Sequence, residues 1–195
     1  MSEISTAPQR RRPSRRAAIL LAGGIAALAF ALDQASKLWV EQTLALGEQI
    51  DVLPPVLYFR HHLNPGAAFS MGTDYTWIFT LIQATVLVLA LWWFRRLGGS
   101  WLWALALGGL AGGVAGNLTD RLFRPMAPGD GGDHTFGLGA VVDFIGVPNF
   151  AVFNVADSFI VCSIIGLCAL MIFGWGIDGS RERAEASDKD ETPAS

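Results

Sequence analysis

The sequence contains few charged residues, two cysteines and three histidines. Asp, Glu, Lys and Arg make up 16% of its 195 residues, against about 25% in an average soluble domain. This deficit argues against a soluble globular domain, and the net charge of −3 gives no support for a nucleic-acid-binding face. With 52% hydrophobic residues, a chain of this length is expected to form one domain that lies largely in lipid.

The scarcity of reactive side chains also limits the chemistry. His61, His62 and His134 do not occur in a metal-binding spacing such as H-E-x-x-H, so we expect no metal and no other cofactor. No serine stands in a G-x-S-x-G setting. Cys162 and Cys168 share one apolar run, where they cannot bridge each other and have no histidine beside them. Hydrolytic chemistry in this chain would therefore rest on carboxylates.

Four long stretches of the sequence are apolar and uncharged. They cover residues 17–32, 75–94, 97–119 and 158–177, and the first continues as a helical pattern to about Val40. A helix needs about 20 mainly apolar residues to cross a bilayer. The pattern predicts an all-α membrane protein with four transmembrane helices.

The first stretch has an alternative interpretation as an export signal. Residues 10–16 are rich in arginine, Ser14-Arg15-Arg16 resembles a twin-arginine signal, and Ala29-Phe30-Ala31 resembles a cleavage site. The apolar run slightly exceeds a typical signal core of about 7–15 residues, however, and three further spans follow it. We therefore favour a first span that is retained.

Arginine placement predicts the orientation of the chain. Positively charged residues near span ends favour the cytoplasm, and they occur here before span one, between spans two and three, and after span four: Arg10, Arg11, Arg12, Arg15, Arg16, Arg95, Arg96, Arg181 and Arg183. Both termini are thus expected inside and the loops 41–74 and 120–157 outside. We expect a disordered basic tail at 1–16, a membrane domain at 17–178 and a disordered acidic tail at 179–195.

The loops and the third span carry further structural signals. Short β-type runs at 49–52 and 56–61 predict a small extramembrane sheet on the membrane surface. The segment 122–138 is rich in Gly, Pro and Asp, and a loop of that length is often a functional lid. Span three carries glycines that favour close helix packing rather than chemistry, at Gly108, Gly109, Gly112, Gly113 and Gly116.

Polar residues gather at the predicted outer ends of the spans. Asp33 and Lys37 share a helix face by their i, i+4 spacing, and Asp143 lies in a short apolar stretch. The other members are Asn64, Asn117, Asp120, Arg121, Asn154 and Asp157. Each has an ordinary explanation as an ion pair, a span boundary or a helix cap. Together they favour a polar site at the outer face, because charges at membrane depth are costly.

Paired aspartates offer a specific chemistry. Two carboxylates that share one proton can activate a water molecule, since like charges about 3 Å apart cannot both ionise. One carboxylate takes a proton from water while the other donates to the carbonyl or the leaving amine.

Five short motifs occur in a family-specific order. They are D-Q-A-S-K at 33–37, N-P-G-A-A-F-S at 64–70, G-G-V-A-G-N-L-T-D-R at 112–121, V-D-F at 142–144 and F-N-V-A-D at 153–157. The ordered set resembles the lipoprotein signal peptidases (signal peptidase II) over roughly residues 17–178. Departures from the family lie in the long tails and in the glycine- and proline-rich second loop.

The resemblance implies a monomeric aspartic endopeptidase of the bacterial inner membrane, surrounded by phospholipid. Its substrates would be diacylglyceryl-modified prolipoproteins, cleaved just before the lipidated cysteine. The implied fold is a four-helix bundle with a small extramembrane sheet and a short helix, and the implied catalytic pair is Asp143 and Asp157. Within that pair, the helix dipole favours the charged form of Asp157 and the apolar surroundings of Asp143 favour its neutral form, so Asp157 is expected to start as the base and Asp143 as the acid. Ten further residues would shape the site and bind substrate: Asp33, Lys37, Asn64, Gly66, Ala67, Asn117, Asp120, Arg121, Asn154 and Ala156.

Two other classes of function remain open from the residues alone. Intramembrane carboxylates also serve proton relays, but a transporter would need polar residues along a path to the cytoplasm, and spans two and three offer little beyond Gln83 and a few threonines. A membrane scaffold without chemistry would tolerate Asp143→Asn and Asp157→Asn.

Overall fold

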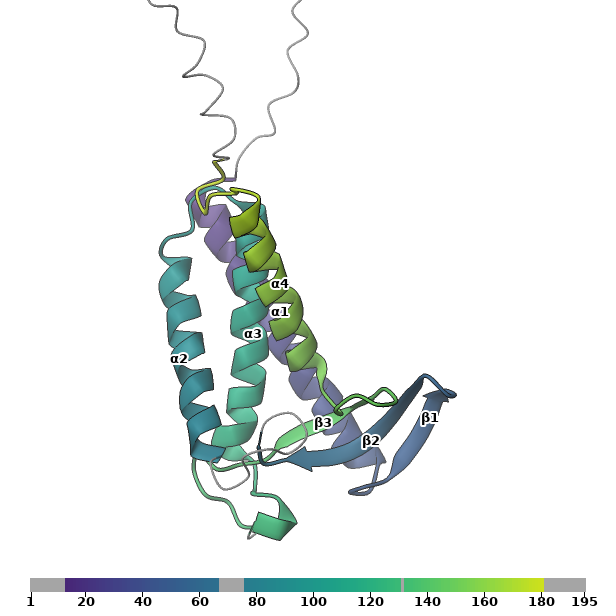
Figure 1. Cartoon of the computed structure of the whole chain (residues 1–195). Coiled ribbons are helices and arrows are strands. Elements are labelled where there is room, and N and C mark those ends of the chain that lie inside the picture. Colours follow the sequence, from purple (N-terminus) through teal and green to yellow (C-terminus); the bar gives the residue numbers. More distant parts are fainter. Residues whose placement is uncertain (1–12, 67–75, 131, 181–195) are drawn as a thin grey trace, which may run out of the picture.

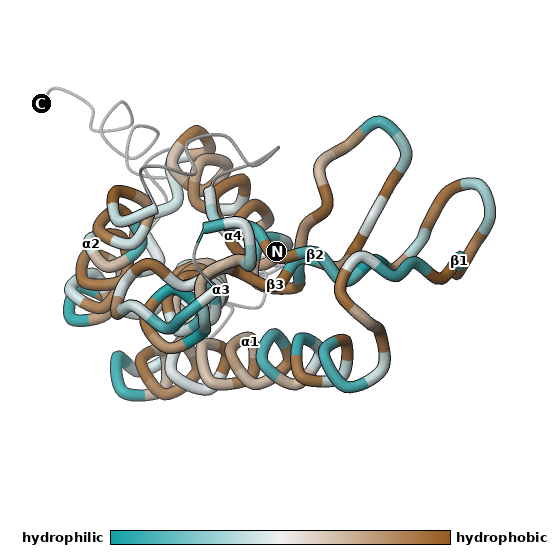
Figure 2. The backbone as a smooth tube through the Cα atoms, turned by 90° about the horizontal axis from the view of Figure 1, so that it is seen from below, coloured by the Kyte–Doolittle hydropathy of each residue, from teal (hydrophilic) through white to brown (hydrophobic). Residues whose placement is uncertain are grey.

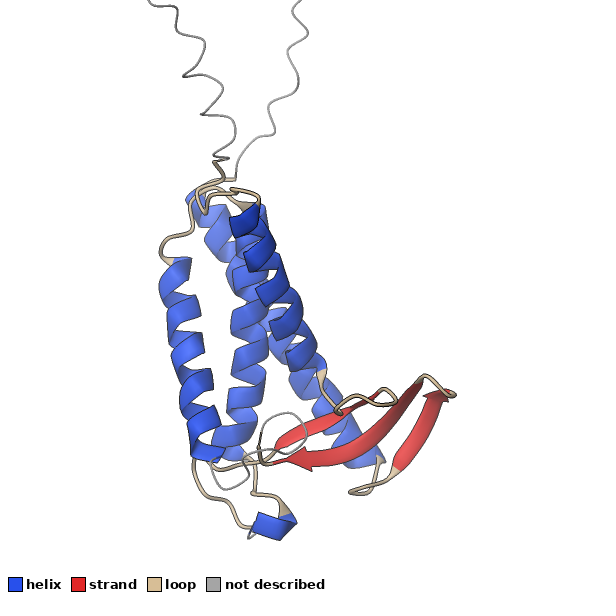
Figure 3. Ribbon diagram, in the orientation of Figure 1, coloured by secondary structure: helices blue, strands red, loops and turns tan. Residues whose placement is uncertain are grey.

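The computed structural model describes residues 13–66, 76–130 and 132–180. Four helices are long and apolar enough to cross a membrane: α1 (Arg15–Thr43), α2 (Thr76–Phe94), α3 (Trp101–Phe123) and α4 (Val155–Ile172). Figure 3 shows these helices beside one small sheet. The prediction of four spans with an extramembrane sheet is therefore confirmed.

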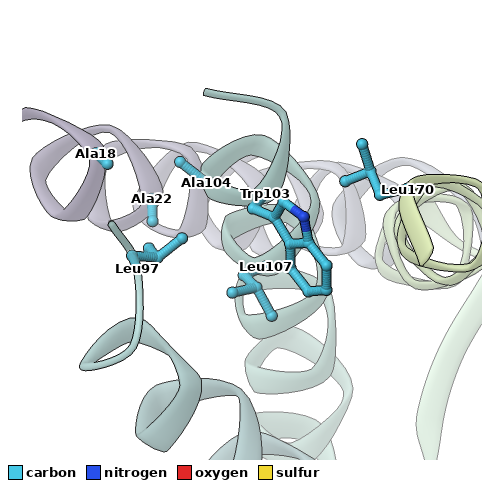
Figure 4. Packing of buried hydrophobic residues seen from close by; sticks show 7 residues of the cluster. All are labelled: Ala18, Ala22, Leu97, Trp103, Ala104, Leu107 and Leu170. Carbon is cyan, nitrogen blue, oxygen red and sulfur yellow. The ribbon is translucent and has the colours of Figure 1, made fainter. Parts of the chain in front are cut away.

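Helix α3 lies at the centre of the bundle and packs against the other three helices. The start of α1 and the end of α4 lie at one end of the bundle, and the sheet lies at the other, which we call the sheet end (Figure 1). At the end away from the sheet, an apolar cluster joins α1, α3 and α4, comprising Ala18, Ala22, Leu97, Trp103, Ala104, Leu107 and Leu170 (Figure 4). Trp103 Nε1 also donates to the carbonyl of Trp175 at 2.8 Å.

Close helix packing depends on glycines along two faces of α3. A Cβ on Gly112 would lie 2.4 Å from the carbonyl oxygen of Ala26 in α1. A Cβ on Gly113 would lie 2.7 Å from the carbonyl oxygen of Ala156 in α4. Neighbouring helices therefore approach α3 more closely than any side chain would allow, which agrees with the packing role predicted for these glycines.

Replacing Gly112 with alanine is expected to destabilise the protein by about 1–3 kcal/mol, because backbone atoms of α1 would have to move. Thermal unfolding in detergent measures the effect. Gly23→Ala is the matched control, since nothing lies within 4 Å of a Cβ at Gly23, and alanine favours helix there. Equal unfolding temperatures for the two variants would contradict the packing role.

The sheet has three antiparallel strands in the order β1 (Gln49–Leu53), β2 (Leu57–Asn64) and β3 (Val141–Gly146). The first two match the predicted β-type runs, and their hairpin projects sideways from the helices (Figure 2). Strand β3 was not predicted, since its buried run of apolar residues has no alternating pattern. Its pairing places Asp143 opposite His62 and Val141 opposite Asn64. The second loop also contains a short 3₁₀ helix, η3 (Pro128–Asp130).

Candidate active site

Two carboxylates line one cavity of about 650 Å³ near the sheet end. Asp143 lies in β3 and is 2% exposed, whereas Asp157 lies in the first turn of α4 and is half-buried. The cavity walls are mainly apolar and come from α2, α4 and the segment 150–153. The fold thus presents a carboxylate pair to a space that is open to a large, mostly apolar ligand.

Both oxygens of Asp143 accept hydrogen bonds from side-chain amides. Asn64 Nδ2 donates to Oδ2 at 2.8 Å, and Asn154 Nδ2 donates to Oδ1 at 2.7 Å. Burial, and after it the negative charge of Asp157, raise the pKa of Asp143 to about 7, although the two amide hydrogen bonds act in the opposite direction. Asp143 is therefore largely protonated below neutral pH.

Asp157 is held by the cap of its own helix. Asn154 Oδ1 accepts from the backbone N–H of Asp157 at 2.9 Å, and Asp157 Oδ2 accepts from the backbone N–H of Asn154 at 3.1 Å, which completes a capping box. Asn117 Nδ2 donates to Asp157 Oδ1 at 2.7 Å. Because Asn154 also binds Asp143, this single amide side chain sets the positions of both carboxylates.

A buried ion cluster stands behind the pair. The Nζ atom of Lys37 lies 2.8 Å from carboxylate oxygens of Asp33 and of Asp120, and it donates to Asn117 Oδ1 at 2.8 Å. Asp33, Lys37 and Asp120 are 0% exposed. Since an ammonium group can only donate, the oxygen of Asn117 must face Lys37 and its NH₂ group must face Asp157.

Arg121 is used to fix the backbone beside the site. Its Nη1 atom donates to the carbonyls of Asn64 at 3.1 Å, Pro65 at 2.8 Å and Gly139 at 3.1 Å, and its Nη2 atom donates to the carbonyl of Gly66. These hydrogen bonds from one guanidinium group join the end of β2 to the segment before β3. It thereby places the side chain of Asn64 against Asp143.

The residues predicted from the sequence therefore meet at one place, but in different roles. Asn64, Gly66, Asn117, Arg121, Asp143 and Asp157 line the cavity. A second set stands behind the cavity: Asp33, Lys37, Asp120, Asn154 and Ala156. Within it, Lys37 and Asn154 bind lining residues directly. The backbone N–H of Ala156 donates to Asp33 Oδ1 at 2.9 Å, which ties the start of α4 to α1. The predicted binding residue Ala67 lies outside the described residues.

Sequence reasoning missed the wall of the cavity on α2. Phe79, Ile82 and Gln83 line it at i, i+3 and i+4 positions of one helix face. The only signal for this wall was a polar Gln83 within an apolar span. Among the described residues, no group of three His, Cys, Asp or Glu side chains is placed to hold a metal ion.

Comparison with known proteins assigns this arrangement to a family. The family model described as Signal peptidase (SPase) II matches residues 25–173. The chain is 43% identical to a lipoprotein signal peptidase of Mycobacterium avium, over 94% of this chain and 95% of that protein. It is 47% identical to one of Streptomyces coelicolor, over 89% of this chain and 80% of that protein.

The chain belongs to the signal peptidase II family. Members of this family are aspartic peptidases, so the protein is a hydrolase. Two solved structures of bacterial membrane enzymes share the fold. One has a TM-score of 0.66 and 22% identity over 96% of this chain and 100% of that chain. The other has a TM-score of 0.61 and 24% identity over 84% of this chain and 97% of that chain. The chain is thus a multi-pass membrane protein of this family.

Proposed function

We propose that this enzyme removes signal peptides from diacylglyceryl-modified prolipoproteins by cleaving just before the lipidated cysteine, with Asp143 and Asp157 as its catalytic pair. The proposal rests on one observation: a buried aspartate and a second aspartate in the first turn of a helix line the same cavity in a four-span bundle. Family membership supports the substrate class, because the curated relatives are lipoprotein signal peptidases.

The two carboxylates divide the proton transfers. Asp157 accepts a proton from a water molecule as the water oxygen attacks the scissile carbonyl carbon. Asp143 donates its proton to the carbonyl oxygen, which gives a neutral tetrahedral diol. The diol then returns a proton to Asp143, while the proton on Asp157 passes to the leaving nitrogen as the C–N bond breaks. The pair ends with one proton, as it began.

The cavity suits a substrate that is part lipid and part peptide. Its apolar walls on α2 and α4 can take acyl chains, and Asn64, Asn117 and Arg121 make the lining of its catalytic end polar. The positive-inside rule supports an orientation with this end at the outer face of the membrane and both termini in the cytoplasm. One chain supplies both aspartates and the cavity walls, so the enzyme is proposed to act as a monomer within the phospholipid bilayer.

Cleavage by the purified protein tests the proposal directly. A precursor peptide that carries diacylglyceryl on its cysteine should be cut just before that cysteine, in the presence or absence of a metal chelator. The same precursor without lipid should remain intact. Loss of cleavage with chelator alone would contradict the carboxylate mechanism, and equal cleavage of both precursors would contradict the lipid requirement.

The pH profile should follow the proton on Asp143. Its pKa is raised to about 7, so the acid is available below that pH and is lost above it. We expect kcat/KM to fall about tenfold per pH unit above an apparent pKa of the pair near 7. Initial rates measured from pH 5 to 9 with subsaturating substrate provide the test. A profile that stays level to pH 9 would argue against Asp143 as the acid.

A further inference from the structure

Helix α2 contains three threonines and one glutamine, and the glutamine differs from the threonines in its hydrogen bonding. The hydroxyl of Thr76 donates to the carbonyl of Pro65 at 2.6 Å, and that of Thr80 to the carbonyl of Gly137 at 2.6 Å. Thr85 donates to the carbonyl of Leu81 at 2.8 Å. By contrast, the Oε1 atom of Gln83 is buried and has no hydrogen-bond partner among the residues that the structure describes.

An unpaired amide is costly in this position. Apolar surroundings make an unsatisfied polar group unfavourable. Gln83 nonetheless lines the cavity that contains Asp143 and Asp157. Rotation about its last side-chain torsion is soft, so the amide can turn its oxygen or its nitrogen into the cavity. A group of this kind facing a catalytic cavity is suited to a ligand that supplies the missing partner.

We infer that Gln83 binds a backbone peptide group of the signal peptide, close to the cleaved bond. The inference rests on the proposed function and adds a residue that holds its substrate. The unpaired oxygen of Gln83 needs a donor, which a peptide unit provides through its N–H, and the NH₂ group of Gln83 can donate to a peptide C=O. The diacylglyceryl group offers ester oxygens, which are acceptors only. The segment of the signal peptide that enters the active site must be extended rather than helical. Its backbone N–H and C=O groups then need new hydrogen-bond partners.

The first test compares Gln83→Met with Thr85→Val. Methionine keeps the length of the side chain and removes the amide, and Thr85→Val removes a polar group from the exposed side of the same helix. For Gln83→Met we expect KM to rise about tenfold, with kcat within about twofold, since the contact is to a group that does not react. The unfolding temperature should stay the same or rise, because an unpaired buried polar atom is removed. Thr85→Val should keep the KM of the wild type.

The second test identifies the substrate group. Each of the three peptide bonds on the signal-peptide side of the cleavage site is replaced in turn by an ester, which removes its N–H. One ester should raise the KM of the wild-type enzyme about tenfold and leave that of Gln83→Met unchanged. Replacing the lipid esters by ethers should affect both enzymes equally.

Four results would overturn the inference. In the first test, these are an unchanged KM in Gln83→Met, or a fall in its unfolding temperature and kcat without a rise in KM. In the second test, they are equal effects of every backbone ester on both enzymes, or lipid ethers that raise the KM of the wild type and leave that of Gln83→Met unchanged. Wild-type cleavage reports separately on the proposed function. A wild-type enzyme that does not cut the lipid-modified precursor would overturn both proposals, whereas active wild type with an unaltered variant would overturn only the role of Gln83.

Discussion

Replacing Asp143 or Asp157 with asparagine is expected to lower kcat/KM for precursor cleavage by about 10³-fold or more. Asparagine has the same shape but cannot exchange a proton with water or with the leaving amine. Both variants carry a further cost, because both oxygens of each carboxylate accept from N–H donors, and the new NH₂ group would face one of those donors. Single-turnover cleavage of the lipid-modified precursor measures the effect.

Controls separate this loss from misfolding. Asp130→Asn removes an exposed carboxylate in η3 and should leave cleavage unchanged. Each dyad variant should still unfold cooperatively in detergent. The double variant should be about as inactive as either single one, because the two groups act as a unit. More than about a tenth of wild-type activity in either single variant would contradict the proposed pair.

Replacing Lys37 with methionine is expected to cost about 3–5 kcal/mol of folding stability and to abolish cleavage. The change leaves Asp33 and Asp120 as buried carboxylates without the cation that lies 2.8 Å from both. It also removes one of the two donors to the oxygen of Asn117 and leaves only Asn154 Nδ2, which weakens the orientation that presents the NH₂ group of Asn117 to Asp157. Unfolding in detergent and cleavage of the lipid-modified precursor report the two effects.

Two further variants show whether uncompensated negative charge causes the loss of stability in Lys37→Met. Arg124→Met removes another cation bound to Asp120, at a more exposed position, and should cost only about 1 kcal/mol. Adding Asp33→Asn to Lys37→Met removes one of the uncompensated charges and should recover part of the lost stability. If Lys37→Met were as stable as the wild type, the ion cluster would have no part in holding the site.

The helix ends show what a hydropathy pattern misses. The third span was expected at 97–119 but α3 runs over Trp101–Phe123. Its last turn includes Asp120, which pairs with Lys37 of α1, and Arg121, which donates to backbone carbonyls of other segments. The fourth span was expected at 158–177 but α4 is Val155–Ile172. It begins at the Asn154 cap, and Gly174 with a φ of 66° follows its end. Caps and buried partners, rather than apolarity, set these limits.

The sequence by itself determined the number of spans, the first two strands and the set of polar residues that gather at one end, since apolar length and residue spacing are local properties. Only the tertiary structure decided how these residues are used. It placed Lys37 behind Asn117 and bound Arg121 to backbone carbonyls. It also placed Asp143 within strand β3 and Gln83 in the cavity wall. Such roles depend on which donor meets which acceptor across segments far apart in the chain, and no local pattern contains that information.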